Sequence, residues 1–203
     1  MELAAFLRLL PPRRDLWIFG YGSLMWAPGF RPAESSPAYH WGHHRALCIL
    51  STRYRGTPRR PGLVTGLCRG GSCWGMAFRV PARRVPRVLA GLWEREMLRG
   101  VYRPQLVPVR IGTGRRVRAL AFVADPEHPH FVRELDLHGR ARLVAQGVGK
   151  RGRSLDYIRN TLEHMAALGL TDPHLARVLA TAEAMRESAA SRRARGVAKF
   201  RRT

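Results

Sequence analysis

Leu16-Trp17-Ile18-Phe19-Gly20-Tyr21-Gly22-Ser23-Leu24 is the stretch that decides the fold, because an apolar run passes directly into a glycine turn. Leu16 to Phe19 have the length and aromatic content of a buried strand. The glycines on either side of Tyr21 let the backbone turn sharply and approach a ligand closely, with N–H groups exposed as donors to an anion or oxyanion. A tight turn after a strand explains the same residues without a ligand, and the dinucleotide-binding pattern GxGxxG is absent. We therefore predict a strand over Trp17 to Tyr21 that ends in a candidate binding turn.

Outward from this strand, the sequence predicts five more short strands, mostly β-branched or aromatic runs bounded by glycine, proline or basic turns. These strands are Arg45 to Ser51, Leu63 to Cys68, Cys73 to Val80, Gln105 to Ile111 and Val117 to Ala124. Helices are predicted at Val85 to Met97, near Leu137 to Gln146, from the N-cap Ser154 to Gly169, and after the N-cap Asp172. Six short strands with segregated helices predict one α+β domain, a small mixed β-barrel-like sheet with surrounding helices.

The predicted helix Val85 to Met97 carries a carboxylate on its apolar face. Its apolar residues recur at helical spacing at Val85, Val88, Leu89, Leu92 and Trp93. At ~100° per residue Glu96 falls near the centre of this face, and Arg95 is expected on the opposite side. A carboxylate forced inward either pairs with a cation or rises in pKa, and both outcomes are common at active sites. A structural glutamate paired with an arginine explains the position as well.

Length and composition define the setting. At 203 residues the chain can bury the core of one domain, and we expect an N-terminal extension over 1–15, a domain over 16–185 and a basic, disordered tail over 186–203. No run approaches the ~18 consecutive apolar residues of a membrane span, and the N-terminus lacks the features of a signal peptide. Cys48, Cys68 and Cys73 cannot all pair within one chain, so we expect a cytoplasmic location. They lack the ligand spacing of zinc sites, so no metal is expected.

The net charge of +22 suggests a nucleic-acid partner, but the distribution of the charge argues against one. Arginines are scattered along the whole chain, and the one dense block, Ser191 to Thr203, contains only Phe200 for stacking on bases. A positive surface also raises the rate of encounter with an anionic small molecule. We therefore expect a small-molecule partner, with neither a specific nucleic acid nor a membrane.

Five motifs occur together between residues 16 and 180. They are WIFGYGSLMWAPGF (Trp17 to Phe30), STRYRGTPRRPGLVTGL (Ser51 to Leu67), GGSCWGMAFRV (Gly70 to Val80), WEREMLRGVY (Trp93 to Tyr102) and SLDYIRNTLEHM (Ser154 to Met165). In combination they closely resemble the ChaC-type γ-glutamylcyclotransferases, although each piece alone would not be specific. The resemblance implies a single domain of the γ-glutamylcyclotransferase-like fold.

The resemblance also implies an activity, that of a lyase which cyclises γ-glutamyl compounds. The expected substrate is glutathione or another γ-glutamyl peptide, and glutathione would give 5-oxoproline and cysteinylglycine. The glutamate of the family's Arg-Glu pair, which maps onto Glu96, would be the catalytic base. The family's YGSL turn and the strand end before it would bind the glutamyl end of the substrate. The matching residues are Ile18, Phe19, Gly20, Tyr21, Gly22, Ser23 and Leu24. Because the cyclisation is intramolecular, the resemblance implies no cofactor and no metal.

Other residues and functions remain open at this point. Tyr157 matches a family tyrosine and could donate a hydrogen bond into a pocket, although helical spacing allows a surface or packing role as well. Arg53 and Arg55 could bind a substrate carboxylate as bidentate donors. The glycine-rich loop Gly147 to Gly152 fails the P-loop pattern. Two alternative functions are a γ-glutamyl hydrolase that uses Ser23 as nucleophile and a basic RNA-binding module without turnover.

Overall fold

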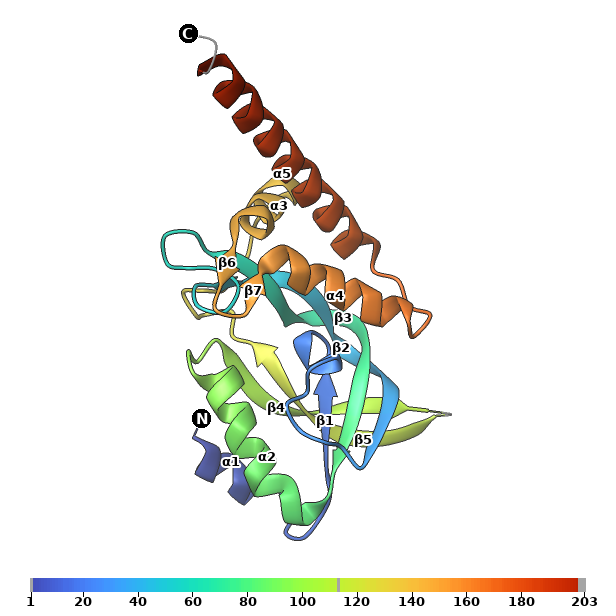
Figure 1. Ribbon diagram of the computed structural model, residues 1–203. Coiled ribbons are helices and arrows are strands. Elements are labelled where there is room, and N and C mark those ends of the chain that lie inside the picture. Colours follow the sequence, from blue (N-terminus) through green and yellow to red (C-terminus); the bar gives the residue numbers. More distant parts are fainter. Residues whose placement is uncertain (1, 113, 201–203) are drawn as a thin grey trace.

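A closed barrel of five strands forms the centre of the protein (Figure 1). The structure is a computed structural model that describes residues 2–112 and 114–200, with side chains described as far as residue 192. The strands are β1 (Leu16–Gly20), β2 (Glu34–Ser51), β3 (Gly62–Val80), β4 (Tyr102–Ile111) and β5 (Arg115–Ala124). Their order is β1-β3-β2-β4-β5, and parallel pairing of β1 with β5 closes the barrel. The other neighbours in this order pair antiparallel, so the sheet is mixed, as predicted.

Strand β1 is buried on both faces, which explains its continuous apolar sequence. Trp17 and Phe19 pack in the barrel interior with alternate residues of the other strands. Leu16 and Ile18 point the other way and pack beneath the helices outside the barrel. The glycine turn that follows, together with the short 3₁₀ turn η1 (Ser23–Met25), is therefore attached to one of the most buried strands of the fold.

Helices lie on two sides of the barrel (Figure 1). They are α1 (Leu3–Leu9), α2 (Val85–Leu92), α3 (Leu137–Gln146), α4 (Ser154–Ala166) and α5 (Pro173–Phe200). On one side, Phe6 of α1 and Leu89 of α2 pack against Ile18 of β1. On the other side, α3, α4 and α5 form a layer in which Ile158 packs with Leu63 of β3. The barrel and its helices together confirm the predicted single α+β domain.

Two long strands replace three predicted short ones. Strand β3 runs without interruption through Leu63 to Cys68 and Cys73 to Val80, which were predicted to be separate. Gly70 and Gly71 have positive φ values of 90° and 70°, and the register against β2 shifts opposite them. The glycines that suggested a turn therefore form a bulge that bends one long strand around the barrel. The strand predicted at Arg45 to Ser51 is only the second part of β2, which begins at Glu34.

The starts of the last two helices were predicted with mixed success. Asp172 is an N-cap as predicted, because its Oδ1 accepts a hydrogen bond of 3.0 Å from the backbone N–H of Leu175. The prediction that Ser154 caps α4 is wrong. The Ser154 hydroxyl instead accepts from the backbone N–H of Leu63 at 3.1 Å and donates to the carbonyl of the same residue. This exchange ties the start of α4 to the barrel wall.

The C-terminal segment is helical where the sequence predicted disorder over 186–203. Helix α5 continues as far as Phe200, while residues 201–203 lie outside the described residues. Leu175, Val178 and Ala182 anchor α5 in the helical layer, and the helix then extends away from the barrel (Figure 1). Alanine and arginine favour the helix, so they extend one that packing has already nucleated. Within the described part of the chain, no helix has both the length and the apolarity needed to cross a membrane.

Candidate active site

Two adjoining hollows lie beside the glycine turn. The larger has a volume of about 200 Å³ and the smaller about 30 Å³. They share part of their walls, because Ser23, Glu96, Tyr102 and Tyr157 line both. These side chains come from the glycine turn, the segment after α2, strand β4 and helix α4. A hollow with a few convergent polar groups at its base is the usual form of an active site.

The structure brings most of the predicted site residues together. Tyr21, Gly22, Ser23 and Leu24 line the smaller hollow together with Glu96 and Tyr157. Ile18, Phe19 and Gly20 line neither hollow. Ile18 packs under the helices and Phe19 packs inside the barrel, while Gly20 lies directly against the backbone of Leu24 and Met25. These three residues hold the turn in place from behind.

A widened helical turn brings both Arg95 and Glu96 to the hollow. Helix α2 ends at Leu92 and continues as a π-helical turn, η3 (Trp93–Met97). The prediction that Glu96 faces inward is confirmed, since its side chain is only 16% exposed. The prediction that Arg95 faces the opposite side is wrong, since its side chain is 13% exposed and its Nε lies 2.9 Å from Glu96 Oε1. A π-turn separates successive side chains by a smaller angle than an α-helix does, so both neighbours can point into one site.

The surroundings of Glu96 alter its proton affinity. Burial raises the pKa of its carboxyl above the ordinary glutamate value, because the charged form loses its hydration. The nearby guanidinium groups of Arg95 and Arg151 lower the pKa and so oppose burial, but the pKa remains raised. A carboxyl whose pKa lies closer to neutrality both accepts and returns a proton more readily at physiological pH.

Gly22 and Tyr157 lie in close contact in the wall of the smaller hollow. Tyr157 is 5% exposed, and its hydroxyl is hydrogen-bonded to Thr65 through the threonine hydroxyl and, at 3.3 Å, the backbone N–H. A Cβ on Gly22 would lie 2.6 Å from the Tyr157 hydroxyl oxygen and 2.7 Å from Thr65 Oγ1. Glycine is therefore required here by the approach of a side chain. The alternative of a surface position for Tyr157 is wrong. Helix α4 packs against α5 as well as against the barrel, so a larger part of its circumference is buried.

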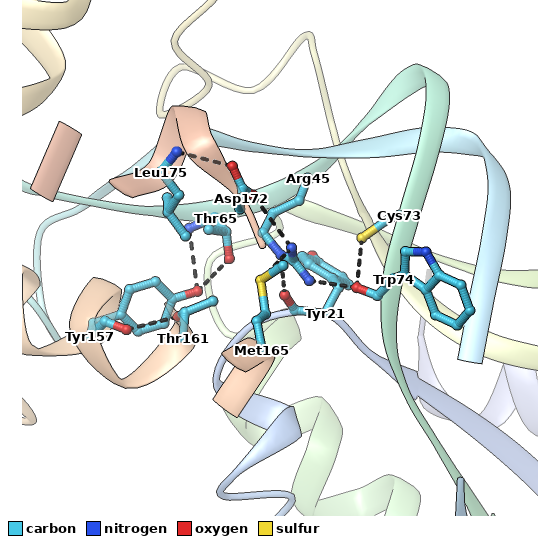
Figure 2. A network of polar contacts seen from close by, with 10 residues as sticks. All are labelled: Tyr21, Arg45, Thr65, Cys73, Trp74, Tyr157, Thr161, Met165, Asp172 and Leu175. Atoms are coloured by element: carbon cyan, nitrogen blue, oxygen red, sulfur yellow. Dashed lines mark hydrogen bonds and ion pairs between the residues drawn. The ribbon is translucent and has the colours of Figure 1, made fainter. Parts of the chain in front are cut away.

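A buried arginine holds the base of the glycine turn (Figure 2). The side chain of Arg45, on β2, is 5% exposed. Its Nε donates to the carbonyl of Tyr21 at 2.6 Å, and its Nη2 donates to the carbonyl of Trp74 at 2.6 Å. Its Nη1 contacts Met165 Sδ at 2.9 Å and Asp172 Oδ2 at 3.5 Å. One guanidinium thus connects the turn to β3, α4 and the start of α5.

Ser23 has a cation as its partner. Its hydroxyl oxygen accepts a hydrogen bond of 2.7 Å from Nη2 of Arg95, whose Nη1 also donates to the carbonyl of Ala27. A guanidinium cannot take the proton of an attacking hydroxyl, because it stays protonated in proteins. Among the side chains that the structure describes, no histidine is hydrogen-bonded to Ser23. The geometry therefore does not support the alternative in which Ser23 is an activated nucleophile.

Sequence reasoning missed several residues of the site. Arg45 and Thr65 lie in strands and gave no signal, because their partners are distant in the chain. Tyr102 stood in a matched motif without an assigned role; its hydroxyl donates to the carbonyl of Thr65 at 3.2 Å. Arg151 is one of 36 basic residues, and nothing in the sequence distinguishes it. Among the described residues, no three His, Cys, Asp or Glu side chains are grouped so that they could hold a metal ion.

Comparisons with known proteins agree on one family. Residues 16–185 match the family model described as ChaC-like protein. The chain is 37% identical over 174 residues to the glutathione-specific gamma-glutamylcyclotransferase of Escherichia coli (strain K12). The aligned region covers 86% of this chain and 75% of that protein. The chain is 31% identical over 179 residues to the human glutathione-specific gamma-glutamylcyclotransferase 1, covering 83% and 81% of the two chains.

Solved structures agree on the fold. The crystal structure of the selenomethionine-labelled yeast γ-glutamyl cyclotransferase specific to glutathione superposes with a TM-score of 0.79 at 20% sequence identity. The match covers 85% of this chain and 97% of that chain. At this identity the likeness concerns the fold, while the family model and the relatives above define the family. The chain therefore belongs to the family of ChaC-like proteins.

Proposed function

We propose that this protein is a lyase that cyclises glutathione to 5-oxoproline and releases cysteinylglycine. The observation that carries the proposal is a buried carboxyl group, Glu96, which has a raised pKa and lines the same small hollow as the glycine turn. The relatives of this protein that match over most of the chain are named glutathione-specific gamma-glutamylcyclotransferases.

The reaction needs a base and a positioned substrate. The α-amino nitrogen of the glutamyl group attacks its own γ-carbonyl carbon, and the C–N bond to the leaving amine breaks as the five-membered ring closes. The amino group must first lose the proton of its ammonium form. Glu96 takes that proton, and after the attack it takes the second proton, which the attacking nitrogen loses as the ring closes. Both protons pass in turn to the departing amine, which leaves as an ammonium group, so the enzyme ends in its starting state. The remaining contribution is positioning, because the nucleophile and the electrophile belong to one molecule.

The other residues of the hollow position the glutamyl end. Backbone N–H groups of the turn from Tyr21 to Leu24 stabilise the developing oxyanion, and the strand end Ile18 to Gly20 holds that turn. Tyr157 and Tyr102 complete the lining of the smaller hollow beside the turn. These residues lie within 16–185, which we take as the catalytic domain, with 1–15 and 186–203 outside it.

We also propose that the enzyme works in the cytoplasm on a small molecule, with no specific nucleic acid or membrane partner. Cys48, Cys68 and Cys73 are all free thiols, which agrees with a reducing compartment. The net charge of +22 favours encounters with an anion such as glutathione.

The direct test is to incubate the purified protein with glutathione and identify the products by mass. We expect 5-oxoproline and cysteinylglycine in equal amounts, at a rate that EDTA leaves unchanged. Release of free glutamate would instead support the hydrolase alternative. Salt-sensitive RNA binding without product formation would support the binding-module alternative.

Gly22→Ala is expected to lower kcat/KM for glutathione by roughly 10- to 100-fold, because the new methyl group displaces the Tyr157 hydroxyl from the hollow. Gly91→Ala is the matched control, since a Cβ at that helical position meets nothing within 4 Å. Steady-state kinetics on both variants check the prediction. Equal activity of Gly22→Ala and Gly91→Ala would contradict it.

A further inference from the structure

The larger hollow is strongly positive. Five arginines and one histidine line it: Arg53, Arg55, Arg95, Arg99, Arg151 and His130. Among the described residues that line it, Glu96 is the only acidic one, and Arg95 is already paired with it. The hollow therefore has several unneutralised cations where the leaving part of a substrate would lie. Such a site favours an anionic group.

Among the arginines of this hollow that lie over an aromatic ring, Arg151 lies closest to its ring, whereas Arg53 lies 5.8 Å from the Tyr54 centroid and Arg55 5.6 Å from the Tyr157 centroid. Arg95 is hydrogen-bonded to Ser23, and Arg55 donates to the carbonyl of Arg153 at 3.2 Å. The guanidinium of Arg151 lies over the ring of Tyr54, 4.4 Å from its centroid. Within the described part of the chain, it makes no side-chain hydrogen bond. Stacking leaves the N–H groups at the edge of the guanidinium plane free for two parallel bonds to a carboxylate.

The backbone under Arg151 is held firmly against the wall of the hollow. The residue lies at the tip of the hairpin formed by β6 (Val148–Gly149) and β7 (Gly152–Arg153). The backbone N–H of Lys150 donates to the carbonyl of Arg53, and that of Arg151 donates to the carbonyl of Tyr54, both at 2.9 Å. A Cβ on Gly149 would lie 2.6 Å from the Arg53 carbonyl oxygen. The glycine-rich loop, which fails the P-loop pattern, thus serves to dock this hairpin closely.

We propose that Arg151 is a specificity-determining residue that binds the C-terminal carboxylate of the leaving peptide. The inference rests on the proposed function and narrows its substrate class to γ-glutamyl peptides with a free C-terminal carboxylate. With the γ-amide at Glu96, the leaving peptide extends into the larger hollow, whose wall includes Arg151. Uncharged γ-glutamyl amines and C-terminal amides lack the group that Arg151 binds.

The test compares glutathione with its glycine carboxamide, which has the same shape without the terminal charge. For the wild-type enzyme we expect KM to be about 10- to 100-fold higher for the amide, as for loss of a charged hydrogen bond, with kcat nearly unchanged. Arg151→Gln should raise KM for glutathione by a similar factor and leave KM for the amide unchanged. Arg151→Lys should fall between, since it keeps the charge and loses the planar fork.

Two controls make the test specific. Arg153→Gln removes an exposed arginine from the same hairpin and should behave as the wild type. Arg99→Gln removes another cation of the same hollow and should change the ratio of the two KM values less than Arg151→Gln does. An unchanged ratio in Arg151→Gln, or an equal change in Arg99→Gln, would overturn the inference alone. Failure of the wild type to form 5-oxoproline from either compound would overturn the proposed function and the inference together.

Discussion

Replacing Glu96 by glutamine is expected to lower kcat by at least the ~10²–10⁴-fold typical of removing a general base. Glutamine keeps the shape and hydrogen-bonding capacity of the side chain but cannot take a proton from the substrate ammonium. The turn from Tyr21 to Leu24 is intact in this variant, so binding of γ-glutamyl ligands should persist and the loss should fall on kcat.

The matched control is Glu94→Gln, which makes the same chemical change on an exposed residue two positions away in the same π-turn. Measuring kcat and melting temperature on the same preparations separates catalysis from stability. If Glu96 were only structural, Glu96→Gln would lower the melting temperature and leave turnover per folded molecule nearly unchanged. A well-folded Glu96→Gln protein with near wild-type kcat would refute its role as base.

The pH dependence of wild-type activity gives an independent test of Glu96 as the general base. Glu96 must be deprotonated to act as base, so kcat/KM should fall as the pH is lowered through its pKa. Burial raises that pKa, so the acid limb should lie above the ordinary glutamate value of ~4.3.

Arg45→Met is expected to destabilise the fold by about 3–5 kcal/mol, the range for breaking a buried ion pair by removal of one partner. The change leaves Asp172 unpaired and deprives the carbonyls of Tyr21 and Trp74 of their donor. Urea unfolding monitored by circular dichroism measures the loss.

The matched control for that variant is Arg177→Met on the exposed face of α5, which should change the free energy of unfolding by no more than about 0.5 kcal/mol. Asp172→Asn should cost less than Arg45→Met, because the arginine keeps both of its carbonyl acceptors. Similar unfolding midpoints for Arg45→Met and Arg177→Met would show that the buried guanidinium does not stabilise the turn.

The sequence predicted those features that arise from local patterns. The apolar run into the glycine turn, the barrel-like α+β domain and the inward position of Glu96 follow from spacing and composition. The break at Gly70-Gly71 was misread, because a bulge and a turn use the same residues. Arg45 could not be found, since its partners Tyr21 and Asp172 lie 24 and 127 positions away.

Tyr157 shows a second limit of sequence reasoning. Helical spacing put it beside the main apolar seam of α4 and left its burial undecided. Helix α4 packs against both the barrel and α5, so it buries residues on more than one face. Only the tertiary structure reveals that α5 covers the second face. The basic tail was misjudged for a related reason, because docking of the first turns of α5 extends a helix that composition alone does not predict.

Because of the π-turn at Trp93–Met97, the direction of the Glu96 side chain depends on the number of residues in this segment as well as on their identity. Each residue of a helix advances the direction of its side chain by a large fixed angle, ~100° in an α-helix, so removing one residue between α2 and Glu96 would rotate the carboxylate away from the hollow. Such a deletion could leave every motif residue on either side unchanged. Insertions and deletions in this short stretch therefore rotate the following side chains about the helix axis. An aligned Arg-Glu pair identifies an equivalent site only where the number of residues between the pair and the preceding helix is also preserved.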